Sequence, residues 1–476
     1  LETMGLPPNF FEVMSRDEDA ERPRGLPLSV STIRTFWRLV RFAWRHSRLL
    51  EETSAYVERH RERLRPYSHA DWSGEPPPDL MDCIDELIDL YSETMWYNFI
   101  GPMNMMIRNR LLTSLVRRWA PDVEPTDLIC GLVGLKSLES NREIGELVAQ
   151  AQELDPESRR TLLEGDDEAI RAALSRTGEG RSLVRSVDAF LDRYGFLSAS
   201  GTDLSRRPWA ENPIVIWRTL GRPAGAAADG RSQDDVAAVR EQARLAVRAR
   251  LNPLRRMVFN RLLASTLAYV RLREDSSLLI SRDSFELRRA FLTLADQLVD
   301  EKWLNQRDDI FYLTVDEVRD VVRGASTPTV VRDSVEARRQ QMRLDRDIQL
   351  PDTIYGGHVP LAPVSLTPDE GFLCGIVGCS GIAEGNARVV LDPAEAPSSL
   401  GREDILVVPF TDVSWTPLFS AVGGVVAETG GQLSHSAIVA REYGLPAVVN
   451  VKQATVVIED GRPILVDGNQ GRVYLR

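Results

Sequence analysis

Residues 423–450 read GGVVAETGGQLSHSAIVAREYGLPAVVN, and this stretch decides how the C-terminal part folds. An apolar run of Val and Ala predicts a strand, and Gly430 and Gly431 end it where the backbone must turn. Ser434 is a preferred helix N-cap, and the apolar residues that follow suit the buried face of a helix. The stretch therefore predicts strand, turn, helix and strand, with His435 in the first turn of the helix.

This position affects the protonation state and the nucleophilicity of the His435 imidazole. The free N–H groups and the positive end of the helix dipole favour an anion there and disfavour a protonated imidazole. A neutral histidine can attack phosphorus and carry the phosphoryl group covalently. We expect Gly430 and Gly431 to form the turn, Ser434 to cap the helix and Arg441 to place its guanidinium near the phosphoryl group. The alternative for Arg441 is a salt bridge with an acid of the same domain.

The order Gly-Gly-x-x-Ser-His-x-Ala-Ile-x-Ala-Arg-Glu-x-Gly-x-Pro, residues 430–446, resembles the phosphohistidine signature of the phosphoenolpyruvate-utilising enzyme family. The resemblance implies that His435 shuttles phosphoryl groups in a domain that swivels between two distant active sites. It also implies ATP and Mg²⁺ as cofactors, with ATP split to AMP and inorganic phosphate.

Composition bounds the remaining possibilities. The chain has 476 residues, which is enough for two or three domains, and its net charge of −12 argues against a general nucleic-acid binder. Its four cysteines have no spacing typical of a metal site, so we expect no metal ligands on this chain. No apolar run approaches the length of a membrane span and no signal peptide is visible, so we expect a cytoplasmic protein without a membrane partner.

The chain divides into a helical part and an α/β part. The predicted fold is multidomain: a largely helical substrate or acceptor domain over 1–350, a Pro/Gly hinge linker over 351–369 and an α/β phosphohistidine swivelling domain over 370–476. One long helix is expected from 234 to 272, continuing in pieces to 303. Expected strands in the last domain are 387–391, 405–409, 425–427, 447–451, 464–466 and 473–475.

Two segments of the helical part resemble the central domain of rifampicin phosphotransferase-type proteins, namely 194–209 and 308–314. Asp203 fits the pattern of the first segment, whereas Leu197 and Gly201 stand where that pattern has Arg and Glu. The sequence therefore leaves the identity of the substrate undetermined.

The sequence contains no P-loop. The resemblance implies an ATP-grasp domain, which we expect upstream in cis or on a partner chain, because this chain begins without Met, about where such a domain would end.

The stretch Met95–Met106 is rich in Met and aromatic residues, which suit either a core or an apolar ligand pocket. We consider Trp96 and Met105 as substrate-binding candidates, with core packing as the alternative. Asp203 is a candidate for orienting or deprotonating an acceptor hydroxyl, or it caps a short turn.

The predicted function is phosphotransfer from His435 to a small organic acceptor. Two alternatives stay open at this point. One is an ATP-dependent ligase or condensing enzyme of secondary metabolism, and the other is a non-catalytic ligand-binding relative.

Overall fold

The computed structural model describes residues 49–68, 70–130, 136–222, 233–345 and 371–476. The chain forms two compact units, Leu1–Glu62 and Arg63–Arg476, and each is considered by itself. The first contains most of helix α3 (Leu49–Leu64), in which the Tyr56 hydroxyl and His60 Nδ1 are 2.9 Å apart. The predicted hinge linker, 351–369, lies outside the described residues, so the domain boundaries placed there stay predictions.

The second unit begins with helices, which the sequence predicts for this part of the chain. Two of them are long, α4 (Pro77–Trp119) and α11 (Pro253–Asp300). The shorter ones are η1 (Pro125–Ile129), α5 (Lys136–Gln152), α6 (Pro156–Glu164), α7 (Asp167–Leu174), α8 (Gly178–Tyr194), α9 (Ile214–Gly221), α10 (Gln233–Ala249), η2 (Arg307–Tyr312), α12 (Val315–Val322) and α13 (Pro328–Asp345).

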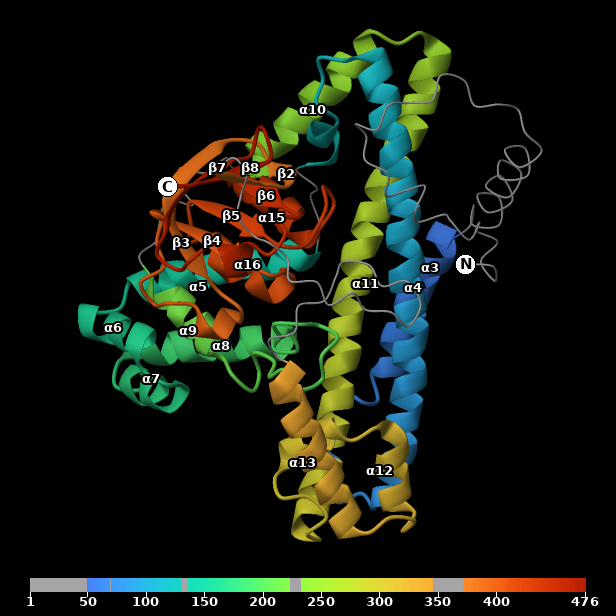
Figure 1. The fold of residues 1–476 in the computed structure, drawn as a ribbon, viewed down its shortest axis with the longest axis vertical. Helices are drawn as coiled ribbons and strands as arrows, with labels where there is room; N and C mark the ends of the chain where they lie inside the picture. Colours follow the sequence, from blue (N-terminus) through green and yellow to red (C-terminus); the bar gives the residue numbers. More distant parts are fainter. Residues whose placement is uncertain (1–48, 69, 131–135, 223–232, 346–370) are drawn as a thin grey trace, which may run out of the picture. The chain divides into compact units, whose positions relative to one another are not determined.

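Helices α4 and α11 lie side by side and antiparallel (Figure 1). The Thr94 hydroxyl donates to Asp283 at 2.6 Å, and Arg108 Nε donates to Ser265 Oγ at 2.8 Å, so later residues of α4 meet earlier residues of α11. The predicted helix from 234 to 272 is wrong in one respect, because it is interrupted: α10 ends at 249 and α11 begins anew after the N-cap Asn252. From Pro253 it then continues unbroken to residue 300, where the sequence suggested pieces.

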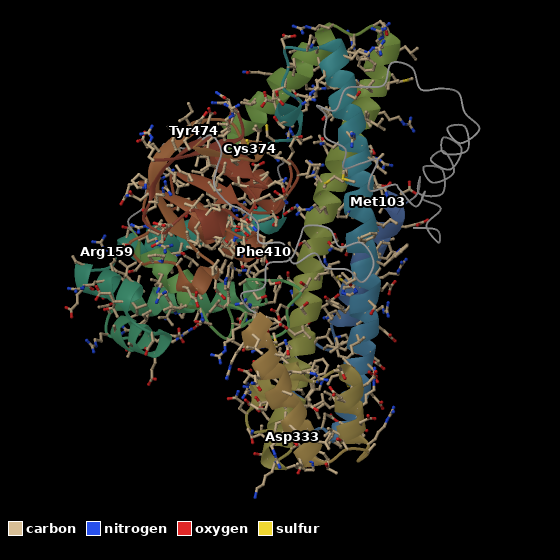
Figure 2. All side chains as sticks on the ribbon, viewed as in Figure 1. Met103, Arg159, Asp333, Cys374, Phe410 and Tyr474 are labelled. Carbon is tan, nitrogen blue, oxygen red and sulfur yellow. The ribbon has the colours of Figure 1, made fainter. Side chains whose placement is uncertain are left out.

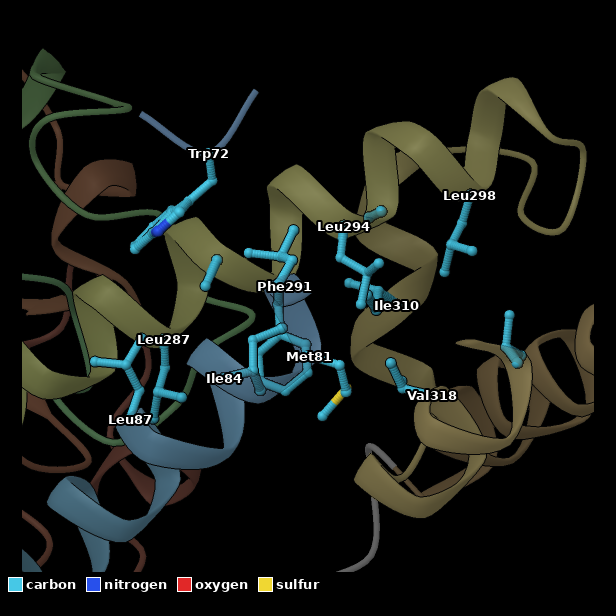
Figure 3. Packing of buried hydrophobic residues seen from close by; sticks show 14 of the residues in the cluster. Trp72, Met81, Ile84, Leu87, Leu287, Phe291, Leu294, Leu298, Ile310 and Val318 are labelled. Atoms are coloured by element: carbon cyan, nitrogen blue, oxygen red, sulfur yellow. The ribbon is translucent and has the colours of Figure 1, made fainter. Parts of the chain in front are cut away.

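One end of the α4–α11 pair is closed by the segments after α11. Leu80, Ile84 and Leu87 of α4 pack with Leu294 and other residues of α11 (Figure 3). Residues from η2, α12 and α13 complete this apolar cluster, among them Ile310, Val318 and Val335. The segment 308–314 is thus fixed against the long helices.

A second group of helices, α5 to α9, has its own core, and it holds the loop that follows α8. Phe190, Trp209 and Trp217 are buried there, and Phe190 stacks on Trp209 with ring centroids 6.0 Å apart. Two backbone bonds, Trp209 N to Leu197 O and Ala210 N to Gly195 O, both 2.8 Å, close the loop. The loop 195–210 is therefore a built element of the fold.

The C-terminal part contains a mixed eight-stranded sheet with the order β1-β8-β7-β3-β4-β5-β6-β2. β3 to β6 are parallel to one another, and the other pairings are antiparallel. Figure 2 marks Cys374 on β1 and Tyr474 on β8. The strands are β1 (Phe372–Cys374), β2 (Ile376–Cys379), β3 (Ile382–Val389), β4 (Asp404–Val408), β5 (Gly424–Ala427), β6 (Ala447–Val449), β7 (Pro463–Asp467) and β8 (Arg472–Leu475).

Alternation along the strands builds two cores, one on each face of the sheet. Val425 and Ala427 pack in the cluster that contains residues of α15 (His435–Tyr443), whereas Val426 packs in the opposite cluster with Ile464 of β7. The short helices of this part are η3 (Pro393–Glu395), η4 (Val413–Trp415), α14 (Thr416–Phe419) and α16 (Ala454–Val457). The fold is therefore a helical part followed by an α/β part, as the sequence predicts.

The loops after β4 and β5 leave the sheet at the same edge, because these neighbouring strands are parallel. The first loop leads into η4 and the second, 428–434, leads into α15. Ligand sites in open α/β sheets lie outside the carboxyl ends of the strands. None of the helices described here combines the length and apolar composition needed to cross a bilayer.

Candidate active site

His435 is the first residue of α15, as the sequence predicts. Ser434 precedes it as N-cap with φ −68° and ψ 159°, and its side chain accepts a hydrogen bond from Ala437 N at 3.3 Å. Gly430 has a φ of +134°, and a Cβ there would lie 2.8 Å from Ser434 Oγ. The turn therefore requires glycine at 430. Gly431 has no positive φ and no atom within 4 Å of an added Cβ, so it does not.

The imidazole of His435 is 5 % exposed and lies between two polar side chains. Its Nδ1 is 3.6 Å from Glu274 Oε2, and its Nε2 is 3.3 Å from Thr416 Oγ1. Glu274 lies in the middle of α11, is 2 % exposed and also pairs with Arg273 at 2.5 Å. A buried carboxylate of the helical part thus faces a nucleophile candidate of the α/β part.

Asp412 forms a second link between the two parts. Its carboxylate accepts from Ser414 N at 3.0 Å and Ser414 Oγ at 2.8 Å in its own loop, and from Gly201 N at 3.0 Å in the helical part. Burial raises the pKa of Asp412, and the hydrogen bonds from Ser414 and Gly201 oppose that shift only in part. Asp412 therefore holds the loop after β4 against the 195–210 loop, close to His435.

Further contacts hold the α/β part on the helical part. Trp415 Nε1 donates to Ala199 O at 3.2 Å, and Arg206 Nη1 lies 2.9 Å from Asp392 Oδ2. Arg218 of α9 donates to Ala394 O at 2.9 Å. With the His435–Glu274 contact, these bonds define one docked arrangement of the two parts.

Arg441 is buried, and within the described part of the chain its hydrogen bonds go to two backbone carbonyls and not to an acid. Nη1 donates to Gly378 O at 2.7 Å and Nη2 to Gln432 O at 2.6 Å, while Nε has no hydrogen-bond partner among the described residues. Burial lowers the pKa of this guanidinium. Arg441 thus braces the loop that precedes His435 against β2, and its predicted contact with a phosphoryl group stays a prediction.

The three substrate-binding candidates do not share one environment. Trp96 is 50 % exposed, whereas Met105 is only 4 % exposed. Met103, which lies two residues before Met105 on α4 (Figure 2), is also buried, at 5 %. Asp203 Oδ1 accepts from Ser205 N at 3.0 Å and from Ser205 Oγ at 2.7 Å, which is the turn-capping geometry that the sequence left as an alternative. A substrate role for these residues stays a prediction.

Sequence reasoning missed Glu274, Thr416 and Asp412. Glu274 carries no local signal, because it stands in a charged and polar run, RLREDSS over 271–277, that is typical of an exposed helix face. Thr416 and Asp412 lie in the stretch 410–419, whose sequence resembles a characteristic loop of the swivelling domain, but neither residue was predicted to belong to the site. Their proximity to His435 depends on tertiary packing that local patterns do not encode.

The arrangement suits transfer of a group through the imidazole. A helix N-terminus supplies backbone N–H groups to an anion, and a buried carboxylate can accept a proton from a donor within reach. Among the residues that the structure describes, no group of three His, Cys, Asp or Glu side chains is placed to hold a metal ion.

Comparisons with known proteins match two regions. Residues 400–471 match the mobile domain of PEP-utilising enzymes, and residues 97–274 match the fourth domain of rifampicin phosphotransferase. A rifampicin phosphotransferase of a Streptomyces species is 36% identical over 329 residues, 66% of this chain and 37% of that protein. Chondramide synthase cmdD of Chondromyces crocatus is 31% identical over 456 residues, 88% of this chain and 11% of that protein.

A prodigiosin synthesizing transferase of Serratia marcescens is 34% identical over 193 residues, 40% of this chain and 22% of that protein. The chain spans a little over a third of the length of the rifampicin phosphotransferases that it matches. The match to the fourth domain of rifampicin phosphotransferase ends at Glu274, and the match to the mobile domain contains His435. The two facing side chains therefore come from two separately matched regions.

Proposed function

We propose a phosphoryl-carrier function for this chain, which belongs, through its two matched domains, to the phosphoenolpyruvate-utilising enzyme family. His435 takes an ATP-derived phosphoryl group and passes it to a small organic acceptor held by the helical part. The observation that carries the proposal is the burial of His435 at a helix N-terminus, with its Nδ1 3.6 Å from Glu274 of the other domain.

The environment of the ring favours Nε2 as the carrier atom. A phosphoryl group on Nδ1 would meet the Glu274 carboxylate, and two negative charges at that separation repel each other strongly in a buried site. Glu274 instead favours a proton on Nδ1, which leaves the lone pair of Nε2 for phosphorus. The Thr416 hydroxyl lies 3.3 Å from Nε2 and donates to Val413 O at 2.8 Å, so it must turn away from that carbonyl before it can donate to a phosphoryl oxygen.

In the transfer step an acceptor oxygen attacks phosphorus, the P–O bond forms and the P–Nε2 bond breaks. The acceptor hydroxyl loses its proton to a base within hydrogen-bond reach, and the imidazole leaves neutral with its proton on Nδ1. Glu274 holds that proton in place. Docking also excludes water, because His435 and Glu274 are both nearly inaccessible, and an unstable phosphoramidate is protected from hydrolysis.

The first half of the reaction takes place elsewhere. ATP and Mg²⁺ are bound by an ATP-grasp domain, either upstream in cis or on a partner chain. Over the whole cycle ATP, the acceptor and one water are consumed, and AMP, inorganic phosphate and the phosphorylated acceptor are formed. The α/β part alternates between that domain and the docked arrangement by rotation on the linker. Rotation breaks the contacts of Asp412 and Trp415 with the 195–210 loop.

A condensing enzyme is the second candidate, and the 195–210 loop favours it. Leu197 is buried in the helical core, and a Cβ on Gly201 would lie 2.4 Å from Ser281 Oγ, so neither position can carry the charge of the resembling pattern. The matches to a chondramide synthase and to a prodigiosin synthesizing transferase agree with a chemistry in which phosphate activates the substrate and then leaves.

Product mass spectrometry separates the two candidates. The chain, joined to its ATP-binding domain, is incubated with ATP, Mg²⁺ and either rifampicin or a panel of hydroxylated, carboxylic and amine compounds. The phosphotransferase predicts a product heavier by one phosphoryl group. A condensed product without phosphorus supports the second candidate, and products that persist in a His435→Ala variant contradict both.

A further inference from the structure

We propose that the helical part holds a second small-molecule site, which takes a neutral aromatic compound with hydroxyl or amine donors and whose occupancy strengthens the docked arrangement. The site is a pocket of about 630 Å³ between the 195–210 loop and the segment after α11. Its lining residues are Thr202, Asp203, Leu204, Ser205, Phe291, Gln306, Asp308, Ile310, Phe311, Tyr312, Leu313, Val315 and Met342.

The Phe291 wall of the pocket is remote from the His435 site. Phe291 lies on the same helix as Glu274 but seventeen residues further on, and at about 1.5 Å per residue this places the two roughly 25 Å apart along α11. Transfer to an acceptor needs the reacting atoms within about 3.5 Å. A compact molecule that packs on the Phe291 wall is therefore not the group that reacts at His435 in the docked arrangement.

The lining selects a neutral ligand with an aromatic body. Phe291, Phe311 and Tyr312 give the pocket aromatic walls. Its two acids have cationic neighbours that offset their charge, since Asp203 Oδ2 lies 3.5 Å from Arg206 Nε and Asp308 Oδ2 lies 3.4 Å from Arg207 Nη2. Carboxylate oxygens that already have cationic neighbours still accept from a hydroxyl or an amine.

The size and position of the pocket agree with this class. Its volume falls within the range of small-molecule sites, about 300–1,000 Å³. Two of its walls, Phe291 and Ile310, belong to the apolar cluster at the end of the α4–α11 pair (Figure 3). These walls are therefore preformed, and the loop residues 202–205, held by hydrogen bonds of their own, form the opposite wall.

The same loop also touches the α/β part. On either side of the pocket-lining residues, Gly201 N donates to Asp412 and Arg206 pairs with Asp392, and Ala199 O accepts from Trp415. Inside the helical part, Ser284 Oγ donates to Gly201 O at 2.8 Å and Arg288 to Leu204 O at 2.6 Å. A ligand that contacts 202–205 stabilises the loop conformation that makes these contacts with the α/β part, so binding and docking favour each other.

Binding is tested on the whole chain with N-phenyl-1-naphthylamine, a neutral aromatic amine that fluoresces in apolar sites. We expect saturable binding that Val315→Trp, which fills the pocket, weakens about tenfold or more. The matched control is Val330→Trp, an exposed position on α13 that does not line the pocket, and it leaves the affinity unchanged. Non-saturable binding, or equal affinity in both variants, would overturn the proposal.

A second pair of variants keeps the test valid if Val315→Trp fails to fold. Met342 and Leu344 are similarly exposed on α13, but only Met342 lines the pocket. Met342→Arg is expected to weaken binding of the same probe, and Leu344→Arg is expected to leave it unchanged. Equal effects of the two arginines would contradict the site.

Coupling is tested by hydrogen–deuterium exchange. The probe should slow exchange of the peptides that cover 199–206 and 411–419 by about threefold or more, because Gly201 N–H is bonded across the domain contact. In Val315→Trp the same addition should change nothing. Saturable binding with unchanged exchange of 411–419 would refute the coupling.

Discussion

Replacing Gly430 with alanine tests how the chain builds the helix start that presents His435. At a φ of +134° an L-residue is strained, and strain of this kind costs of order 1–3 kcal/mol. The new Cβ would also lie 2.8 Å from Ser434 Oγ and displace the cap of α15, which costs about 1 kcal/mol more. We therefore expect Gly430→Ala to lower the free energy of unfolding of the α/β part by about 2–4 kcal/mol.

The adjacent residue provides the control. Gly431→Ala adds a Cβ with no atom within 4 Å and no positive φ to accommodate, so its effect should stay within about 0.5 kcal/mol. Urea unfolding, followed by exchange of peptides from the α/β part, measures both. With a slope of about 2 kcal/mol per molar, Gly430→Ala should lower the midpoint by about 1–2 M.

Equal midpoints for the two alanine variants would refute the reasoning, because the difference rests only on φ and on the contact with Ser434. A larger effect at Gly431 would refute it as well. If the cap positions His435 for phosphorylation, Gly430→Ala should also reduce labelling of His435, whereas Gly431→Ala should not.

Two further changes test the helical part. Glu317 accepts hydrogen bonds from Arg338 and from the Thr314 cap, and these bonds lower its pKa to about 2. A carboxyl whose pKa is lower in the folded state stabilises the fold above its unfolded pKa, and this stabilisation is lost as the pH falls through the folded pKa. Glu317→Gln should therefore lower the free energy of unfolding, measured in urea, by about 1 kcal/mol at pH 7 and by almost nothing near pH 2. Met105→Ala should lower stability by about 2–3 kcal/mol in thermal unfolding, because Met105 is 4 % exposed, whereas Trp96→Ala at a half-exposed position should cost under about 1 kcal/mol. Equal losses at Met105 and Trp96 would contradict the packing described for α4.

Local patterns predicted the helix that begins at His435 well. The N-cap Ser434 and the terminating Gly444, which adopts φ 64°, are signals carried by single residues, so sequence suffices to find them. Strands β3 to β8 were predicted within a few residues for the same reason. β1 and β2 were missed because both are short and sit in a Gly- and Cys-containing stretch whose pairing partners lie far along the chain.

The partners of His435 could not be predicted in this way. Glu274 reaches His435 only because a 48-residue helix and a separate domain pack together.

The break before Pro253 carries a local signal, an Asn N-cap followed by Pro, which outweighs the apolar periodicity on both sides. For Arg441 the local pattern suggested a phosphate contact, but the hydrogen bonds of its guanidinium go to two backbone carbonyls.

The most direct test of the central claim is whether His435 carries the phosphoryl group. The chain with its ATP-binding domain is incubated with Mg²⁺ and ATP labelled on its β- and γ-phosphates, and the label is located by peptide mass spectrometry under alkaline conditions. We expect an acid-labile, alkali-stable phosphoryl group on the peptide that contains His435, and none in His435→Ala or on the other histidines. Label on another residue, or product formation at an undiminished rate in His435→Ala, would contradict the account.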